Sequence, residues 1–176
     1  SSDYYNVYPL LKENKLPGVF FLITDRIGQP GYLNWDQIKE MSKGGMVFGS
    51  HSVSHQRMSL LTESEAEFEF RHSKEVIETE VGCAIDMFSY PFGEYSRKLN
   101  RLASICGYEY FWNSSHGLAR PKSKKFSRNS VHRKMSPKEI SEVLFPTRLK
   151  LINWFLEEKS KLILKKDFGQ STYRKI

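Results

Sequence analysis

Two histidines four residues apart, His51 and His55, are the side chains in this sequence best suited to metal chemistry. They lie in the segment His-Ser-Val-Ser-His. Imidazole is a common ligand of divalent metal ions, and side chains at positions i and i+4 share one face when a segment turns helically. The spacing predicts that His51 and His55 bind one cation. The alternative interpretation is a pair of solvated loop histidines.

A second segment, Ser89-Tyr90-Pro91-Phe92-Gly93, could supply a backbone hydrogen-bond donor. Pro91 fixes its own φ angle and Gly93 permits a tight turn. We therefore expect the N–H of Phe92 to face a cleft, where it could stabilise an oxyanion. The alternative is a structural turn that packs aromatic side chains.

Both segments follow expected strands. The unbroken apolar run Val19–Ile23 predicts a strand that is buried on both faces, as in a parallel sheet. Further strands are expected at Met46–Gly49, Met87–Tyr90, Glu109–Trp112 and Asn129–His132. Helices are expected at Tyr4–Leu11, Asn34–Gly44, Thr62–Gly82, Ser96–Gly107 and Ser136–Pro146, three of them opened by capping boxes. This alternation predicts an α/β fold with functional residues after the carboxyl ends of the strands, in an open doubly wound sheet or a closed barrel.

Composition narrows the class of protein. The chain has 176 residues, of which 39% are hydrophobic, enough for a packed core rather than a disordered tail. No apolar run reaches the ~18 residues that span a bilayer. The first residues lack a signal-peptide pattern, so we expect a cytoplasmic or peripheral membrane location. Cys83 and Cys106 have no metal-binding spacing, and we interpret both as small core residues.

The net charge of +7 favours anionic partners such as membrane surfaces, acidic glycans or nucleic acid. Residues 147–176 are expected to form a basic amphipathic helix, with Leu149, Ile152, Leu156 and Ile163 on its apolar face. This helix could contact a membrane surface. Nucleic acid is not the expected partner, because basic and aromatic residues are not interleaved as in single-strand-binding proteins.

Taken in order, several short motifs closely resemble the polysaccharide deacetylase family, also called carbohydrate esterase family four. The motifs are His51–His55 after Gly49-Ser50, Leu61-Thr62, Ser73-Lys74, Gly82, Phe88–Gly93 and Cys106-Gly107-Tyr108. The opening and the tail look similar too, at Tyr8–Lys12, Phe20–Leu22, Asp25–Gly28 and Phe168–Arg174, the last as in members from bacterial surface-polysaccharide gene sets.

The resemblance implies one deacetylase domain over residues 1–176, with a distorted (β/α)7 barrel. It also implies a metal-dependent hydrolase that removes N- or O-linked acetyl groups from a glycan. His51 and His55 would bind the divalent metal, usually zinc, together with an Asp, and the N–H of Phe92 would serve the oxyanion. Tyr90, Pro91, Phe92 and Gly93 would line the substrate site.

The sequence departs from the family in three places. The family's Thr-Phe-Asp-Asp-Gly motif, which provides the general base and the third metal ligand, falls upstream of Ser1, so the barrel is expected to lack its first strand and catalytic acid motif. Neither Asp3 nor Asp25 stands in its place. Ser89 occupies a position that is often Arg. No Leu-x-His motif is recognisable, which leaves His132, or His116, as a substitute general acid.

The sequence thus predicts a polysaccharide deacetylase. One alternative is a catalytically impaired relative that binds a glycan, which the absent acids would explain equally well. The other is a basic module that binds nucleic acid or a membrane surface.

Overall fold

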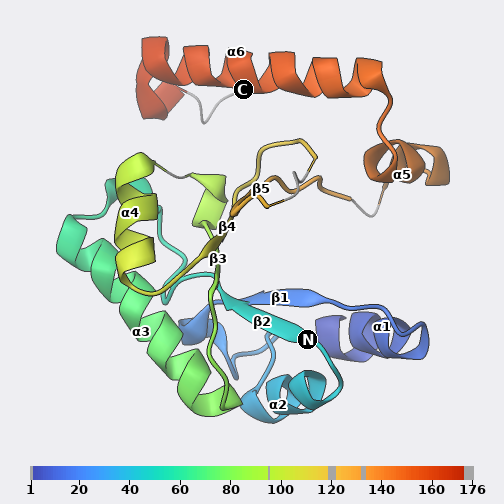
Figure 1. The fold of residues 1–176 in the computed structure, drawn as a ribbon, viewed down its shortest axis with the longest axis vertical. Helices are drawn as coiled ribbons and strands as arrows, with labels where there is room; N and C mark the ends of the chain where they lie inside the picture. The colour runs from blue at the N-terminus through green and yellow to red at the C-terminus, as the bar shows by residue number, and fades with distance from the viewer. Residues whose placement is uncertain (1, 95, 119–121, 132–133, 173–176) are drawn as a thin grey trace. The chain divides into compact units, whose positions relative to one another are not determined.

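The computed structural model describes residues 2–94, 96–118, 122–131 and 134–172 (Figure 1). Contacts divide the chain into two compact units, Ser1–Asn113 and Ser114–Ile176. We call them unit 1 and unit 2 and describe each by itself.

Unit 1 alternates helices with parallel strands. Its strands are β1 (Val19–Leu22), β2 (Val47–Ser50), β3 (Met87–Ser89) and β4 (Tyr110–Trp112). They pair in parallel, and their order in the sheet follows their order in the chain. The predicted α/β class with a parallel sheet is therefore confirmed. The expected absence of the barrel's first strand stays a prediction.

The helices of unit 1 begin where the sequence signals them. The α-helices are α1 (Tyr8–Glu13), α2 (Trp35–Lys43), α3 (Glu63–Val81) and α4 (Arg97–Ile105). A π-helical turn, η1 (Asp3–Val7), leads into α1, and the 3₁₀ turns are η2 (Thr24–Arg26), η3 (Met58–Leu60) and η4 (Pro91–Gly93). The expected capping boxes form at Asn34 with Gln37 and at Thr62 with Glu65. Gly82 ends α3 in the left-handed conformation that favours glycine.

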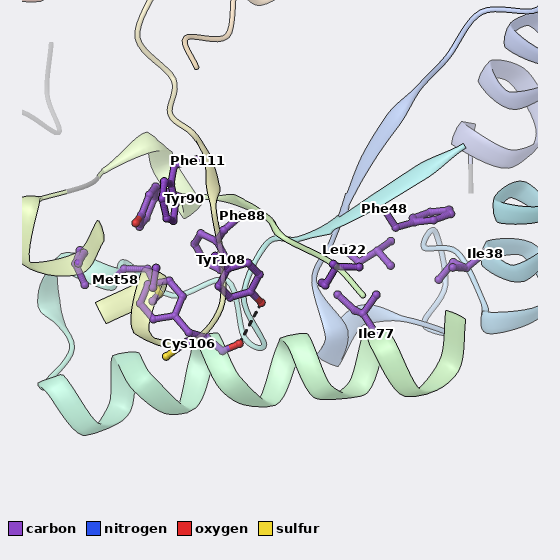
Figure 2. Close-up of a cluster of buried hydrophobic side chains, with 14 of the residues drawn as sticks. Leu22, Ile38, Phe48, Met58, Ile77, Phe88, Tyr90, Cys106, Tyr108 and Phe111 are labelled. Atoms are coloured by element: carbon purple, nitrogen blue, oxygen red, sulfur yellow. Dashed lines mark hydrogen bonds between the residues drawn. The ribbon is translucent and has the colours of Figure 1, made fainter. Parts of the chain in front are cut away.

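The core of unit 1 lies between α3 and the sheet, and α3 also contacts α2 and α4. Figure 2 shows Ile77 of α3 beside Leu22 of β1. In another part of this core, the ring of Phe88 of β3 packs edge to face against two other aromatic rings. The Phe88 ring centroid lies 4.7 Å from Phe70 and 5.1 Å from Tyr108. Edge-to-face pairs of this kind add to the free energy gained by burial alone.

Two expectations for unit 1 are wrong in detail. The strand at Val19–Ile23 is not buried on both faces, because Val19 is 46% exposed and β1 pairs with β2 alone among the described residues. Cys106 is buried as expected, whereas Cys83 is exposed because it lies in the turn just after Gly82.

Unit 2 contains β5 (Lys125–Phe126), α5 (Pro137–Leu144) and α6 (Arg148–Thr172). The capping box at Ser136 and Glu139 opens α5 as predicted. No strand forms over residues 129–131, the described part of the expected last strand, and a short strand lies at Lys125–Phe126 instead. The Asn129 side chain pairs with the Gly117 backbone at 3.0 and 3.1 Å.

The long C-terminal helix α6 confirms the helix expected there. Leu149, Ile152 and Leu156 are each more than half exposed, whereas Trp154 is 6% exposed. The side chain of Ile163 lies outside those the structure describes. Within the described ranges, no helix is both long and apolar enough to cross a bilayer.

Candidate metal and oxyanion site

Both segments singled out in the sequence lie at the same edge of the sheet. His51 follows the last residue of β2, and Tyr90 follows the last residue of β3. These strands are parallel, with Ser50 opposite Phe88, so their carboxyl ends meet. The backbone N–H of His51 also donates to the Leu22 carbonyl of β1 at 2.7 Å. Three strand ends therefore position the segments.

The two imidazole rings lie beside one another, with centroids 4.7 Å apart and an interplanar angle of 67°. The Nδ1 atom of His51 lies 2.6 Å from the Ser89 carbonyl oxygen. A carbonyl only accepts hydrogen bonds, so the proton resides on Nδ1 and the Nε2 atom carries the lone pair. Metal-binding histidines are commonly oriented by a bond of this kind to a backbone carbonyl.

The backbone between the histidines is not helical, although helical turning was the predicted route. Ser52 and His55 both have left-handed backbone angles, with φ of 72° and 61°. The loop is stabilised from within: the Ser52 hydroxyl accepts a hydrogen bond from the His55 N–H at 3.0 Å. The rings meet because of this strained loop rather than because of i,i+4 helix geometry.

The carboxylate of Glu69 anchors the loop between His51 and His55 by accepting its hydrogen bonds. Glu69 belongs to α3 and is 5% exposed. One of its oxygens accepts the N–H groups of Val53 and Ser54 at 2.7 and 3.0 Å, and the other accepts the Ser54 hydroxyl at 2.5 Å. Three donors to one carboxylate fix the loop, because losing the acceptor would leave a buried N–H unpaired.

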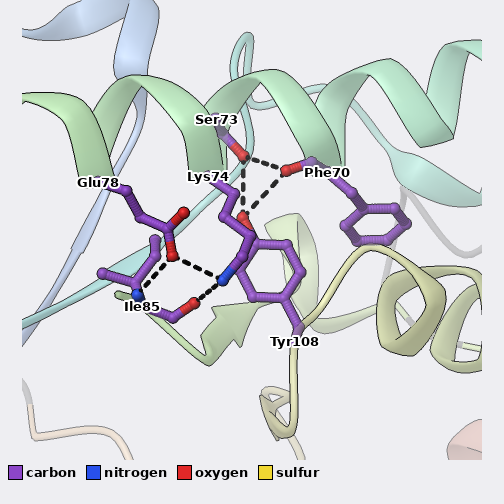
Figure 3. Close-up of polar contacts among 6 residues, drawn as sticks. All are labelled: Phe70, Ser73, Lys74, Glu78, Ile85 and Tyr108. Atoms are coloured by element: carbon purple, nitrogen blue, oxygen red, sulfur yellow. Dashed lines mark hydrogen bonds and ion pairs between the residues drawn. The ribbon is translucent and has the colours of Figure 1, made fainter. Parts of the chain in front are cut away.

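The position of α3 is set by a second buried polar cluster, drawn in part in Figure 3. The Ser73 hydroxyl lies 2.7 Å from the Ser50 hydroxyl at the end of β2 and 3.2 Å from the Tyr108 hydroxyl. Tyr108 also donates to the Phe70 carbonyl at 3.1 Å. Burial raises the pKa of Tyr108 to about 12, so this hydroxyl stays protonated and keeps donating at any ordinary pH.

A neighbouring polar cluster in Figure 3 joins the far end of α3 to the loop before β3. Lys74 pairs with Glu78 at 2.8 Å and donates to the Ile85 carbonyl, while Glu78 accepts the Ile85 N–H at 2.8 Å. The first cluster ties the carboxyl end of β2, next to His51, to α3, and the second ties the segment before β3 to the same helix.

The electrostatics of His55 favour metal binding. Burial lowers the pKa of His55, and the positive charge of Arg26 lowers it further. Both causes disfavour imidazolium, so the ring is neutral at physiological pH. Neutral imidazole is the form that binds a metal ion.

The turn after β3 presents Phe92 beside this pair. The Phe92 ring lies 5.0 Å from the His55 ring and is 52% exposed. The Phe92 backbone is left-handed, with φ 58° and ψ 8°. The Gly93 N–H donates to the Tyr90 carbonyl at 2.9 Å, whereas the Phe92 N–H makes no hydrogen bond to any described residue. A backbone donor therefore remains for a ligand.

Of the four residues expected to line a substrate site, two are buried. Tyr90 is 0% exposed and donates its hydroxyl to the Asn100 side chain at 2.7 Å. Pro91 is also fully buried, so these side chains support the turn from inside. Phe92 and the half-buried Gly93 are the two that reach the surface.

No group of three or more His, Cys, Asp or Glu side chains in the described part of the chain is arranged to hold a metal ion. His51 and His55 thus fit two positions of a metal site, and the described residues group no third protein ligand with them. Asp25 lies in η2, near the loop, where its N–H donates to the Val53 carbonyl at 3.1 Å. Its side chain is exposed.

Three further histidines occur in the chain. His132, the expected general acid, is outside the described residues. His116 belongs to unit 2, stacks on Trp154 with centroids 5.4 Å apart, and lines a cavity of about 670 Å³ together with Glu158. The exposed His72 of α3 stacks on Phe68, with ring centroids 5.0 Å apart.

Sequence reasoning missed Glu69, Arg57 and Glu94. A signal for Glu69 exists: it stands on the face of α3 that carries Ala66, Phe70 and Ile77 at apolar spacing. A carboxylate on a buried helical face indicates a bound partner. Arg57 and Glu94 carry no comparable pattern.

Comparisons with known proteins show which family and which relatives this chain is similar to. Residues 1–111 match the profile of the family described as polysaccharide deacetylase. YxkH of Bacillus subtilis, named as a polysaccharide deacetylase, is 28% identical over 119 residues, covering 68% of this chain and 43% of the relative. The poly-beta-1,6-N-acetyl-D-glucosamine N-deacetylase of Staphylococcus aureus is 26% identical over 137 residues, covering 70% of this chain and 47% of the relative.

The fold is similar to that of solved deacetylases. The Streptococcus pyogenes deacetylase PplD, solved in complex with acetate, superposes with a TM-score of 0.76 at 23% identity over 82% of this chain and 66% of that one. The chain spans less than half the length of the two curated relatives.

Proposed function

Because this chain belongs to the polysaccharide deacetylase family, we propose that it removes acetyl groups from a polysaccharide with a divalent metal ion held by His51 and His55. The observation that carries the proposal is the pair of rings 4.7 Å apart at the carboxyl ends of parallel strands. This is where α/β enzymes place their active sites.

The chemistry asked of this site is hydrolysis of an acetyl amide or ester. His51 and His55 would hold a zinc ion, which would lower the pKa of a bound water and polarise the acetyl carbonyl. Water adds to the carbonyl carbon, the bond to the sugar nitrogen or oxygen breaks, and acetate leaves while the sugar gains a proton. In this chain, the Ser89 carbonyl orients His51, Glu69 fixes the loop, and the Phe92 N–H is available to the oxyanion.

We propose an N-acetylated glucosamine polymer as the substrate, because the Staphylococcus aureus relative is named for that polymer. The reaction would then convert a neutral amide into a free amine. General-base catalysis of the water attack calls for a carboxylate, and the described residues hold none grouped with the two histidines.

A zinc titration of variants tests the proposal. His51→Ala should weaken zinc binding by at least tenfold, whereas the matched control His72→Ala, an exposed histidine of α3, should not. Acetate release from β-1,6-linked N-acetylglucosamine oligomers should depend on zinc and should be lost in His51→Ala. Equal zinc affinity in the wild type and His51→Ala would overturn the metal assignment.

A second candidate, glycan binding without catalysis, is favoured by the missing third ligand among the described residues. Oligomer binding without acetate release, in the full protein that carries this sequence and with zinc bound, would establish it. Zinc-dependent acetate release would exclude it.

A further inference from the structure

The backbone of Phe92 holds a conformation that needs support. Its angles, φ 58° and ψ 8°, place a bulky side chain in the left-handed region. This conformation is strained for a residue other than glycine, and it persists only when the surroundings enforce it. Gly93, the next residue, also has a positive φ of 67°. The turn therefore contains two successive left-handed residues, and only one of them is glycine.

Two side chains, Arg57 and His55, lie against the Phe92 ring. The Arg57 guanidinium lies over the Phe92 ring, 4.4 Å from its centroid, at a distance where cations attract aromatic rings. Arg57 forms an ion pair with Glu94, and the Ser59 hydroxyl donates to the other Glu94 oxygen at 2.8 Å. The His55 ring lies 5.0 Å from the Phe92 ring.

The ion pair is well placed to be rigid. The side chains of Arg57 and Glu94 are 29% and 13% exposed, so water screens the pair less than a fully exposed one. Glu94 comes directly after the turn, and Arg57 comes two residues after His55. The pair therefore joins the histidine loop to the Phe92 turn.

We propose that Arg57, anchored by Glu94, is a positioning residue that holds Phe92 in its left-handed conformation and so keeps the Phe92 N–H available to the oxyanion. The inference rests on the proposed function for the role of that N–H. The part of the inference that concerns the backbone conformation of Phe92 depends only on the contacts of Arg57 with Phe92 and Glu94. Arg57 does not touch the acetyl group in this account. It acts through the ring and backbone of Phe92.

The conformational part is tested in the metal-free protein by NMR with ¹³C- and ¹⁵N-labelled phenylalanine. In Arg57→Ala, the backbone shifts and the coupling constant of Phe92 should leave left-handed values, while Arg57→Lys should keep a larger left-handed population. The matched control is Arg71→Ala, which removes an exposed ion pair with Glu67 on α3. Unchanged Phe92 shifts in Arg57→Ala would overturn the proposal.

The functional part is tested by adding acetate, the product anion, to the zinc-loaded protein. Acetate should shift the Phe92 amide, and Arg57→Ala should weaken acetate binding about tenfold, the effect expected for a misplaced charge-assisted donor. Zinc affinity should stay unchanged. In the Phe92→Gly background, where the left-handed turn needs no support, Arg57→Ala should have little further effect. Equal losses from Arg57→Ala in both backgrounds would contradict positioning through Phe92.

These readouts separate the two failures. If the wild type does not bind zinc, the proposed function fails while the Phe92 shifts still decide the conformational role of Arg57. If zinc and acetate bind equally well in Arg57→Ala and the wild type, the inference fails and the proposed function stands.

Discussion

Replacing Glu69 should disorganise the histidine loop. Glu69 accepts two backbone N–H groups and one hydroxyl while almost fully buried. Glu69→Ala removes all three bonds and leaves the N–H of Val53 buried without an acceptor. Each unpaired group of this kind costs about 1–3 kcal/mol, and hydrogen bonds to a charged group contribute about 1.5–3 kcal/mol. We therefore expect Glu69→Ala to lower the free energy of unfolding by about 3–5 kcal/mol.

Glu69→Gln separates the geometry from the charge. The glutamine carbonyl can accept both N–H groups, and its amide can donate to the Ser54 hydroxyl, so the loss should be about 1 kcal/mol. Urea unfolding gives the two free energies, and a zinc titration shows whether the loop still binds metal. Glu75→Ala, an exposed change on the same helix, is the matched control.

Two outcomes would refute this reasoning. One is a Glu69→Ala protein within 1 kcal/mol of the wild type. The other is a Glu69→Gln protein that is as unstable as Glu69→Ala, because the loop would then depend on the negative charge rather than on the accepted bonds.

Three further predictions concern pH, packing and the metal ligands. Because the folded pKa of Tyr108 is raised to about 12 from 10.0, stability should be intact below pH 10 and should fall as pH rises toward 12, by up to roughly 3 kcal/mol, and Tyr108→Phe should lack this alkaline loss in urea unfolding measured across pH. Gly49→Ala should lower the melting temperature, since a Cβ there would lie 2.9 Å from the Met87 carbonyl oxygen; an unchanged melting curve would contradict the close packing of β2 on β3. His55→Ala should weaken zinc binding as much as His51→Ala does, and a variant with wild-type affinity would remove His55 from the site.

Local sequence signals predicted the elements of unit 1 well. The capping boxes at Asn34 and Thr62 and the glycine at position 82 act over a few residues, so their meaning survives folding unchanged. The alternation of strands and helices predicted the parallel sheet, because a helix between two strands returns the chain to the same end of the sheet.

Features that depend on distant neighbours could not be predicted from local pattern. The exposure of Val19 depends on where β1 lies in the sheet, and residues 129–131 form no strand although their sequence is typical of one. Apolar runs and β propensity report neither.

The sequence pointed to His51 and His55 as a candidate site, but it did not reveal the groups that hold them in place. The spacing of His51 and His55 brought both rings to attention, yet their left-handed loop and its carboxylate, Glu69, depend on a helix that begins after the motif ends. The left-handed angle of Phe92 likewise depends on Arg57, which lies far away in the sequence.

Zinc-edge anomalous diffraction from crystals grown with zinc shows directly whether His51 and His55 bind one metal ion. We expect one anomalous peak near 2.0–2.1 Å from the Nε2 atom of His51 and from a ring nitrogen of His55, the usual zinc–imidazole distance. The same peak should vanish in His51→Ala crystals. If both rings are in place with no zinc between them, or if zinc binds only elsewhere, His51 and His55 are not the metal ligands.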